Sequence, residues 1–355
     1  MEKKTKTVKL WMIASILLSV IFIIIILYLT IEPGDIQLLK ETDIKYEFFG
    51  VAILLNFVYW GIWGKRLQIL SNAAEKNVNI TWWESTKIVF ANLFLAGITP
   101  SMAGGEPVRI YLLNKDGMSI GSATASVLGE RLLDAIFILI CVPFAFLIFK
   151  NRIDNYLLNI GLTIGIAIFL VAILLFLYAI KKPEKVKRFL IWFSKKFSRF
   201  SKRREKESKI ILKISNEIDN FHSSMNVFLK DNKSAFIKGE FLTVIMWLSG
   251  WLIPSCILLG LGLDHYLLPA MAAQVFLIII IMMPTTPGAS GISESGVAIL
   301  YSVIITGENS YLLGVFTVIF RFITYHIGII VGAIFQYRIF KSVASFSMDR
   351  IKKSK

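Results

Sequence analysis

The chain has 355 residues, of which 55% are hydrophobic, and its mean hydropathy is +0.67. This composition excludes an ordinary soluble globular protein, and several apolar runs approach or exceed the roughly 20 residues that a membrane-spanning helix needs. The net charge of +15 is concentrated between the apolar runs, as the positive-inside bias produces, so it indicates membrane orientation and not nucleic-acid binding. We expect an all-α polytopic membrane protein.

Two spans are predicted at the start of the chain. The run from Leu10 to Ile31 follows four lysines and is too long for the core of a signal peptide, so we predict that it spans the membrane. A mixed-charge external segment leads to Glu47. The second span is predicted from about Phe48 to Gly64, and its end is set by Lys65-Arg66, where we expect a cytoplasmic connection.

The next apolar run, Thr86 to Ile98, is too short to cross a hydrocarbon core of about 30 Å at about 1.5 Å per residue. A Pro- and Gly-rich break at Thr99 to Gly105 separates it from a second short run. A membrane protein tolerates such a break only where the freed backbone is buried in protein or lines a wet cavity. We therefore predict a re-entrant helical hairpin, residues 86–113, that enters from the cytoplasm. Glu106 would lie at the positive dipole end of the returning arm.

A longer helix, about Ser119 to Phe149, carries Glu130, Arg131 and Asp134 about three turns from its start. At that depth these side chains would face the hairpin and not lipid. After a short external turn, a further span from about Leu157 to Ile180 returns to the cytoplasm. These elements form the predicted first membrane half, residues 1–180.

The following segment is the strongest cytoplasmic marker, because residues 181–213 hold fourteen Lys and Arg against three Glu. Apolar residues recur there at helical spacing, which is typical of a helix on an anionic membrane surface. A second apolar seam, Ile211 to Phe228, alternates steps of three and four residues. We predict a cytoplasmic basic amphipathic helical hairpin, residues 181–236, although the seam could equally serve a homodimer.

The second membrane half, residues 237–337, repeats the plan of the first. A span from about Phe241 to Leu261 precedes a second pair of short apolar arms, which predicts a second re-entrant hairpin, residues 269–306, entering from outside. A last span, about Leu312 to Phe335, leads to a basic tail, residues 338–355. Six full spans and two hairpins place every positive cluster and both termini in the cytoplasm.

The two breaks also share a spacing. The second break, Thr286 to Glu294, has a Thr-Pro, a Gly-rich run and a lone carboxylate, as the first has. Glu106 precedes Arg131 by 25 residues. Glu294 precedes Arg321 by 27 residues, and each arginine lies in the helix after its hairpin. Hairpins that enter from opposite sides make an inverted repeat, and its paired breaks indicate the binding site of a transporter.

Four motifs occur in order: Asn92 with Thr99-Pro100, Gly-Glu-Pro-Val-Arg at 105–109, Gly-Glu-Arg-Leu-Leu-Asp at 129–134, and Pro-Gly-Ala-Ser-Gly-Ile-Ser-Glu at 287–294. Over nearly the whole chain they resemble the lysylphosphatidylglycerol synthase transmembrane, or flippase-like, domain family. That family usually has Gly where this chain has Ala289, and Ser290 adds a hydroxyl. Members that make aminoacylated lipid carry a soluble transferase domain after the membrane part. This chain stops at Lys355 without one, so the resemblance implies the translocating half alone.

The candidate substrate-binding residues belong to the two breaks and to the helices after them. The carboxylates could cap buried helix starts, contact a cationic headgroup or exchange protons with a coupled ion. The arginines offer forked donors for a lipid phosphate or could neutralise the carboxylates, and both can hold at once. The set is Asn92, Thr99, Pro100, Glu106, Arg109, Glu130, Arg131, Asp134, Pro287, Ser290, Glu294 and Arg321. His326 in the last span is a minor candidate.

We expect a lipid translocase of the cell membrane that moves an anionic phospholipid or polyprenyl phosphate between leaflets. Two alternatives stay open: an integral membrane enzyme that modifies a lipid-linked headgroup with Glu106 or Asp134 as acid or base, and a membrane partner subunit of a soluble glycosyl- or aminoacyl-transferase. No metal or cofactor is expected, because Cys141 and Cys256 lack ligand spacing and no nucleotide-binding motif occurs.

Overall fold

The computed structural model describes residues 41–75, 77–99, 104–149, 232–263, 266–281, 286 and 288–335, together with isolated positions between 21 and 38, between 163 and 188, and at 226. The predicted spans at 10–31 and 157–180, the cytoplasmic hairpin and the basic tail lie outside these residues, apart from such isolated positions and the start of one helix at Lys233.

Four helical segments of the described chain are long and apolar enough to cross a membrane. They are α3 (Tyr46–Ala74), α6 (Ile120–Phe149), α10 (Lys233–Gly260) and the continuous segment Leu312–Phe335. The last segment consists of α13 (Leu312–Arg321), a π-helical turn η3 (Phe322–His326) and further helix to Phe335. The protein is therefore an all-helical, multi-pass integral membrane protein in the part that is described, and the predicted spans near 119–149, 241–261 and 312–335 are confirmed as helices.

The helix of the second span does not end at the predicted position, Lys65-Arg66. Helix α3 continues for another eight residues beyond Arg66, to Ala74. Leu67 and Leu70 are fully buried there, and Arg66 is only 1% exposed. The basic pair therefore lies within the helix and does not mark a loop, and Arg66 is paired inside the protein with two carboxylates of α6, Glu130 and Asp134.

Two short helices flank the first break, as predicted. Helix α4 spans Trp82–Ile98 and α5 spans Gly105–Lys115. They pack against each other. The charges of Glu84 and Lys87, in the first turns of α4, act on Asp116 just after α5. The start of α4 and the end of α5 therefore lie at the same end of an antiparallel hairpin.

The start of α4 is fixed by a capping box. The Thr81 hydroxyl accepts a hydrogen bond from the Glu84 amide at 3.3 Å, and the Glu84 carboxylate accepts one from the Thr81 amide at 2.8 Å. We expect Thr81→Ala to destabilise the protein by about 1 kcal/mol, because an orphan amide loses its acceptor. A lower thermal unfolding midpoint in detergent would report this loss. Ser234→Ala, at an exposed site in the first turn of α10, should leave the midpoint unchanged.

The second break is flanked in the same way, by α11 (Leu267–Ile281) and α12 (Ile292–Ser302). The Tyr301 hydroxyl donates to the Ala270 carbonyl at 3.0 Å and accepts from the Gln274 amide nitrogen at 2.8 Å. Gly296 packs against Leu277. The end of α12 thus lies beside the start of α11, and this pair is also an antiparallel hairpin.

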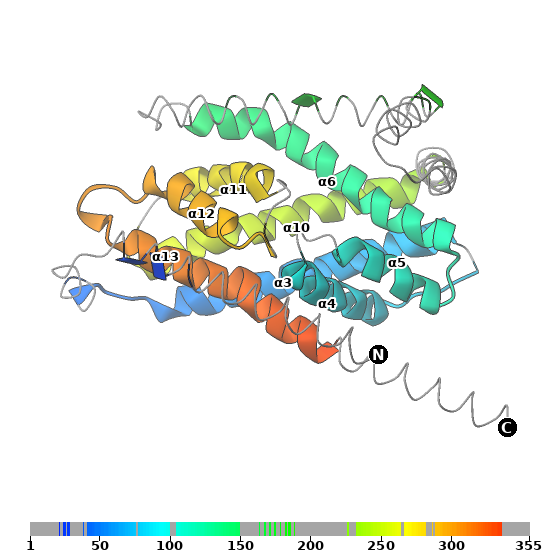
Figure 1. Ribbon diagram of the computed structural model, residues 1–355, viewed down its shortest axis with the longest axis horizontal. Coiled ribbons are helices and arrows are strands. Elements are labelled where there is room, and N and C mark those ends of the chain that lie inside the picture. The colour runs from blue at the N-terminus through cyan, green and yellow to red at the C-terminus, as the bar shows by residue number, and fades with distance from the viewer. Residues whose placement is uncertain are drawn as a thin grey trace, which may run out of the picture.

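The long helices α3 and α10 pack along each other through the middle of the protein, with α4–α5 and α11–α12 toward opposite ends of its long axis (Figure 1). Each hairpin packs against the long helix that follows the other one. Phe276 of α11 contacts Phe149 of α6. Phe90 of α4 contacts Phe335 at the end of the last segment. The two halves are therefore interlocked, and the breaks are brought to the region between them.

The link between α3 and α4 is tied to the start of α6. The backbone amide of Ser119 donates to the Glu75 carboxylate at 2.7 Å. This hydrogen bond holds the pKa of the Glu75 carboxyl below its ordinary value. The stabilisation from this contact is fully present above the unfolded pKa of Glu75 and is lost as the pH falls through the lowered folded value. The hydrogen bond holds the residue before the N-terminus of α6, the helix that carries three candidate site residues.

Candidate functional site

The two breaks meet. The backbone amide of Gly288, in the second break, donates a hydrogen bond to the carbonyl of Thr99, in the first, at 3.2 Å. Beside this bond, the Tyr325 hydroxyl donates to the Gly97 carbonyl at 3.0 Å. Residues almost two hundred positions apart in the sequence therefore form one junction, which we call the tip junction: Gly97, Thr99, Gly288 and Tyr325.

Local geometry explains the residue types at the junction. The Thr99 hydroxyl donates to the Leu95 carbonyl at 2.6 Å and accepts from the Gly104 amide at 2.9 Å, so it closes α4 and bridges the break. Gly288 has a φ of 60°, and a Cβ there would collide with the Tyr325 hydroxyl and the Gly97 carbonyl. Ala289 adopts a φ of 52°, in the left-handed region that favours the glycine usual in the family it resembles.

A cavity of about 330 Å³ lies between the two halves. Its wall is built by α3, α4, α10, α11, the start of α12, one residue of α6 and the last helical segment, Leu312–Phe335. Aromatic side chains make up much of it, among them Tyr59, Trp60, Trp63, Trp247, Trp251 and Tyr325. The charged side chains of the wall are two arginines, Arg131 from the first half and Arg321 from the second. A wall with guanidinium groups and without a carboxylate suits an anionic ligand.

Two side chains of α12 bind Arg321. Its Nε donates to Glu294 Oε1 at 3.0 Å and its Nη1 donates to the Ser293 hydroxyl at 3.1 Å. Glu294 Oε2 also accepts from the Gly291 amide at 2.7 Å, so this carboxylate both caps α12 and pairs with the arginine. The Arg321 guanidinium lies 4.1 Å from the centre of the Tyr325 ring, and its buried Nη2 has no acceptor in the described part of the chain. Arg321 therefore keeps a donor to spare beside the cavity.

The equivalent pair in the first half is formed as well. Arg131 Nε donates to Glu106 Oε1 at 2.6 Å. Both side chains are about half exposed, at 47% and 43%, whereas those of Arg321 and Glu294 are 5% and 0% exposed. The spacing repeat of the sequence thus corresponds to two ion pairs of the same kind. The two pairs differ in solvent exposure: the pair of the first half is half exposed, and the pair of the second half is buried.

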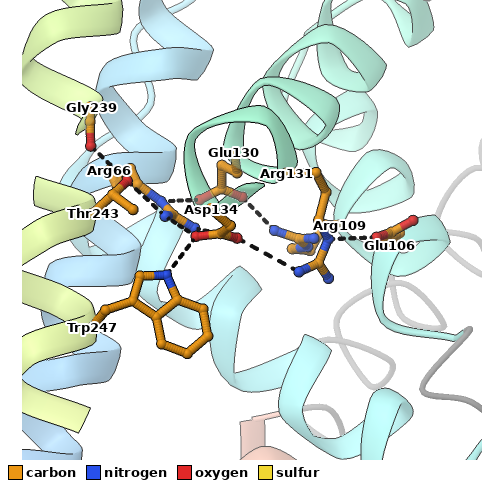
Figure 2. A network of polar contacts seen from close by, with 9 residues as sticks. All are labelled: Arg66, Glu106, Arg109, Glu130, Arg131, Asp134, Gly239, Thr243 and Trp247. Atoms are coloured by element: carbon orange, nitrogen blue, oxygen red, sulfur yellow. Dashed lines mark hydrogen bonds and ion pairs between the residues drawn. The ribbon is translucent and has the colours of Figure 1, made fainter. Parts of the chain in front are cut away.

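Arg131 also belongs to a buried cluster of charges, which Figure 2 shows between α3, α5, α6 and α10. Arg66 donates to Glu130 at 3.2 Å and to Asp134 at 2.6 Å. Arg131 lies 3.7 Å from Asp134. Two side chains of α10 complete the site: the Thr243 hydroxyl accepts from Arg66 at 2.9 Å, and the Trp247 indole donates to Asp134 at 3.0 Å.

Arg109 enters the same cluster from α5. It pairs with Glu130, and its guanidinium lies 5.4 Å from the centre of the Trp63 ring. Its Nε and Nη2 are buried and have no acceptor among the residues that the structure describes. The cluster consists of three arginines and three carboxylates, so its formal charges balance: Arg66, Arg109, Arg131, Glu106, Glu130 and Asp134.

The predicted candidates fall into three groups. Asn92, Arg131 and Arg321 line the cavity. Behind the wall or at the junction lie Thr99, Glu106, Arg109, Glu130, Asp134, Ser290 and Glu294. Pro100 and Pro287 lie outside the described residues. His326 contacts the Arg321 carbonyl through Nδ1 at 3.1 Å and is not part of the cavity wall.

A family model described as the lysylphosphatidylglycerol synthase TM region matches residues 12–332. The chain belongs to this family. A UPF0104 membrane protein of Archaeoglobus fulgidus is 35% identical over 297 residues, which cover 82% of this chain and 87% of that protein. Another, from Pyrococcus horikoshii, is 27% identical over 339 residues, which cover 94% and 98%. No solved structure matches the chain significantly.

The four motifs that suggested the lysylphosphatidylglycerol synthase TM family do not include every residue of the site. Arg66, Thr243 and Trp247 were missed, and so was the aromatic wall contributed by α3. One signal was present: Asn56, Tyr59 and Trp63 recur at spacings of three and four in an apolar run, which places them on one helix face. Within the described ranges, His, Cys, Asp and Glu side chains form no group of three or more that could hold a metal ion.

Proposed function

We propose that this protein translocates a lipid with an anionic, phosphate-bearing headgroup between the leaflets of the cell membrane. The observation that carries the proposal is the cavity at the meeting of the two hairpins, with Arg131 and Arg321 as its charged lining. In this proposal α4–α5 and α11–α12 are re-entrant hairpins of an inverted repeat, and both termini are cytoplasmic. Such repeats place transporter binding sites at their interface near the bilayer midplane.

The size of the cavity supports a headgroup as its occupant. Ligand sites usually measure about 300–1000 Å³, so a cavity of about 330 Å³ suits a small polar group and not a pair of acyl chains. The hydrocarbon tails would stay in the bilayer. Both an anionic phospholipid and a polyprenyl phosphate present this chemistry, and both remain substrates of the proposal.

The ion pairs suggest how the headgroup is held. An incoming phosphate competes with Glu106 for the half-exposed guanidinium of Arg131, because charge-assisted hydrogen bonds form equally well with either anion. Arg321 keeps its buried partner Glu294 and offers its spare Nη2. Passage to the other leaflet then requires the tip junction to open, since it joins the two halves beside the cavity.

The test is leaflet exchange in liposomes that contain labelled phosphatidylglycerol or labelled polyprenyl phosphate. We expect Arg321→Met and Arg131→Met each to slow exchange about tenfold to a hundredfold, because a hydrogen bond to a charged group contributes about 1.5–3 kcal/mol. The matched control is Lys115→Met, which removes an exposed cation at the end of α5. Unchanged exchange in both arginine variants, in folded preparations with an active wild type, would overturn the proposal.

The same vesicles separate translocation from lipid modification. A translocase leaves the lipids chemically unchanged, so their masses before and after the assay should agree. A covalently altered lipid would instead favour an enzyme that uses Glu106 or Asp134 as acid or base. The ion pairs of these two carboxylates with Arg131 and Arg66 do not favour that second role.

A further inference from the structure

A fourth carboxylate lies beside the charged cluster. Glu240 belongs to α10 and precedes Thr243 by three residues and Trp247 by seven, so the three share one helix face. Thr243 and Trp247 contact Arg66 and Asp134, as Figure 2 shows. Asp134 and Arg66 are also the charged groups that act on Glu240. Glu240 therefore adjoins the cluster one helical turn from its polar contacts.

Glu240 differs from the three carboxylates of the cluster because no arginine of the described residues forms an ion pair with it. Glu106, Glu130 and Asp134 each have at least one guanidinium partner, and these three carboxylates already balance the charges of the three arginines. The Oε2 atom of Glu240 is buried and accepts no hydrogen bond from the described part of the chain. Glu240 thus adds one negative charge to a cluster that has no positive charge left for it.

Within the described part of the chain, the elements packed on α10 bring no cation other than Arg66 to act on Glu240. From α3 and α6 the ionisable groups of this region are the members of the cluster and Tyr59. Helix α11 has no ionisable side chain, and Arg321 of the last segment is engaged by Glu294. On α10 itself, Lys233 and Lys238 are exposed. Among the described residues, the charge of Glu240 is left with a shared Arg66 and a repelling Asp134.

We infer that Glu240 carries a proton in this state of the protein and is the proton-binding site of the cluster. An ionised carboxylate with a buried oxygen and no donor costs far more free energy than the neutral acid, and a proton removes that charge. The second half of the inference rests on the proposed function. An anion that draws Arg131 away from Asp134 makes the surroundings of Glu240 more negative, so the proton is held more tightly and anion and proton bind together.

The first experiment needs no ligand. Infrared spectra of the purified protein at neutral pH should contain the C=O stretch of a protonated carboxylic acid, which Glu240→Gln should remove. Glu308→Gln, at an exposed site in η2 (Gly307–Asn309), is the matched control and should keep the band. Glu240→Met provides a second neutral variant should the amide fail to fold. A band that is absent in the wild type, or that survives in the folded Glu240 variants, overturns the assignment.

The second experiment measures the affinity for short-chain phosphatidylglycerol in detergent at several pH values. A phosphodiester is the right probe, because a phosphate monoester titrates itself with a second pKa near about 6. In the alkaline range, where Glu240 of the ligand-free protein loses its proton, wild-type affinity should rise as the pH falls, by up to about tenfold per pH unit for one linked proton. The affinity should level off at lower pH, where Glu240 already holds its proton. Glu240→Gln should bind with little pH dependence, and Glu308→Gln like the wild type.

The two experiments distinguish a failure of the proposed function from a failure of the inference about Glu240. If the probe does not bind the wild type, the proposed headgroup site fails, while the infrared band still decides whether Glu240 holds a proton. If the probe binds with the same pH dependence in wild type and Glu240→Gln, the coupling between anion and proton is wrong. Glu240 then has no role in binding.

Discussion

Replacing Gly288 by alanine is expected to destabilise the protein by roughly 2–5 kcal/mol and to abolish leaflet exchange. The first cause is the backbone, because a φ of 60° costs a residue with a Cβ about 1–2 kcal/mol. The second is the collision of that Cβ with the Tyr325 hydroxyl and the Gly97 carbonyl, since overpacking costs about 1–3 kcal/mol. Both effects act where the two breaks are joined.

Gly307→Ala separates the two causes. Gly307 has a similar φ of 65°, but a Cβ there would meet nothing within 4 Å. The control should therefore lose only the backbone contribution and keep exchange. The thermal unfolding midpoint in detergent and the exchange rate in liposomes are the two measurements. The double variant Gly288→Ala with Tyr325→Phe should recover part of the lost stability, because it removes one of the colliding atoms.

If Gly288→Ala and Gly307→Ala behave alike in both measurements, the close approach of the two breaks is wrong. The consequence would reach beyond one residue. The cavity between the halves depends on this junction, because Gly97 and Tyr325 belong both to its wall and to the tip junction. A failed junction would therefore remove the main support for a shared binding site.

The sequence made the breaks and their arginines predictable. Thr99 and Gly288 could be identified because Pro and Gly interrupt apolar runs that are too short to span, and this signal is local. Two similar spacings marked Glu106 with Arg131 and Glu294 with Arg321 as corresponding residues, and in the structure each of these couples forms an ion pair. Periodicity and repetition carry this information along the chain, without knowledge of how the helices pack.

Arg66 could not be found in this way, because its sequence context has two meanings. A basic pair after an apolar run usually marks the cytoplasmic end of a span. Lys65 fits that meaning, since it is exposed and donates to Gln68 at 2.8 Å. Arg66 points to the other side of the helix, toward carboxylates 64 and 68 positions later in the chain. Only the packing of α3 against α6 distinguishes the two neighbours.

The structure also combines two of the roles that the sequence left open for the carboxylates. Glu294 caps a helix start and neutralises an arginine at the same time. Glu106 is half exposed and pairs with an arginine of the cavity wall. The same motif therefore serves two different physical situations in the two halves. In the proposed transport, a half-exposed pair on one side and a buried pair on the other would give the two halves unequal roles.

Arg66→Met is expected to destabilise the protein by about 3–5 kcal/mol, which is the usual cost of breaking a buried ion pair by removing one partner. Arg66 is 1% exposed and binds Glu130, Asp134 and the Thr243 hydroxyl. Its removal leaves two buried carboxylates with two arginines, of which Arg131 lies 3.7 Å from Asp134. Heat-induced loss of the monodisperse peak in size-exclusion chromatography measures the effect.

Lys65→Met is the matched control, because it removes the adjacent cation at an exposed site and should change stability by less than about 1 kcal/mol. Adding Asp134→Asn to Arg66→Met should cost less than the sum of the two single changes, since the neutral amide no longer needs the missing guanidinium. Equal stability of the Arg66 and Lys65 variants would mean that the cluster is not closed around Arg66. The argument that Glu240 has no positive partner would then fail, because it assumes that Glu130 and Asp134 already neutralise Arg66.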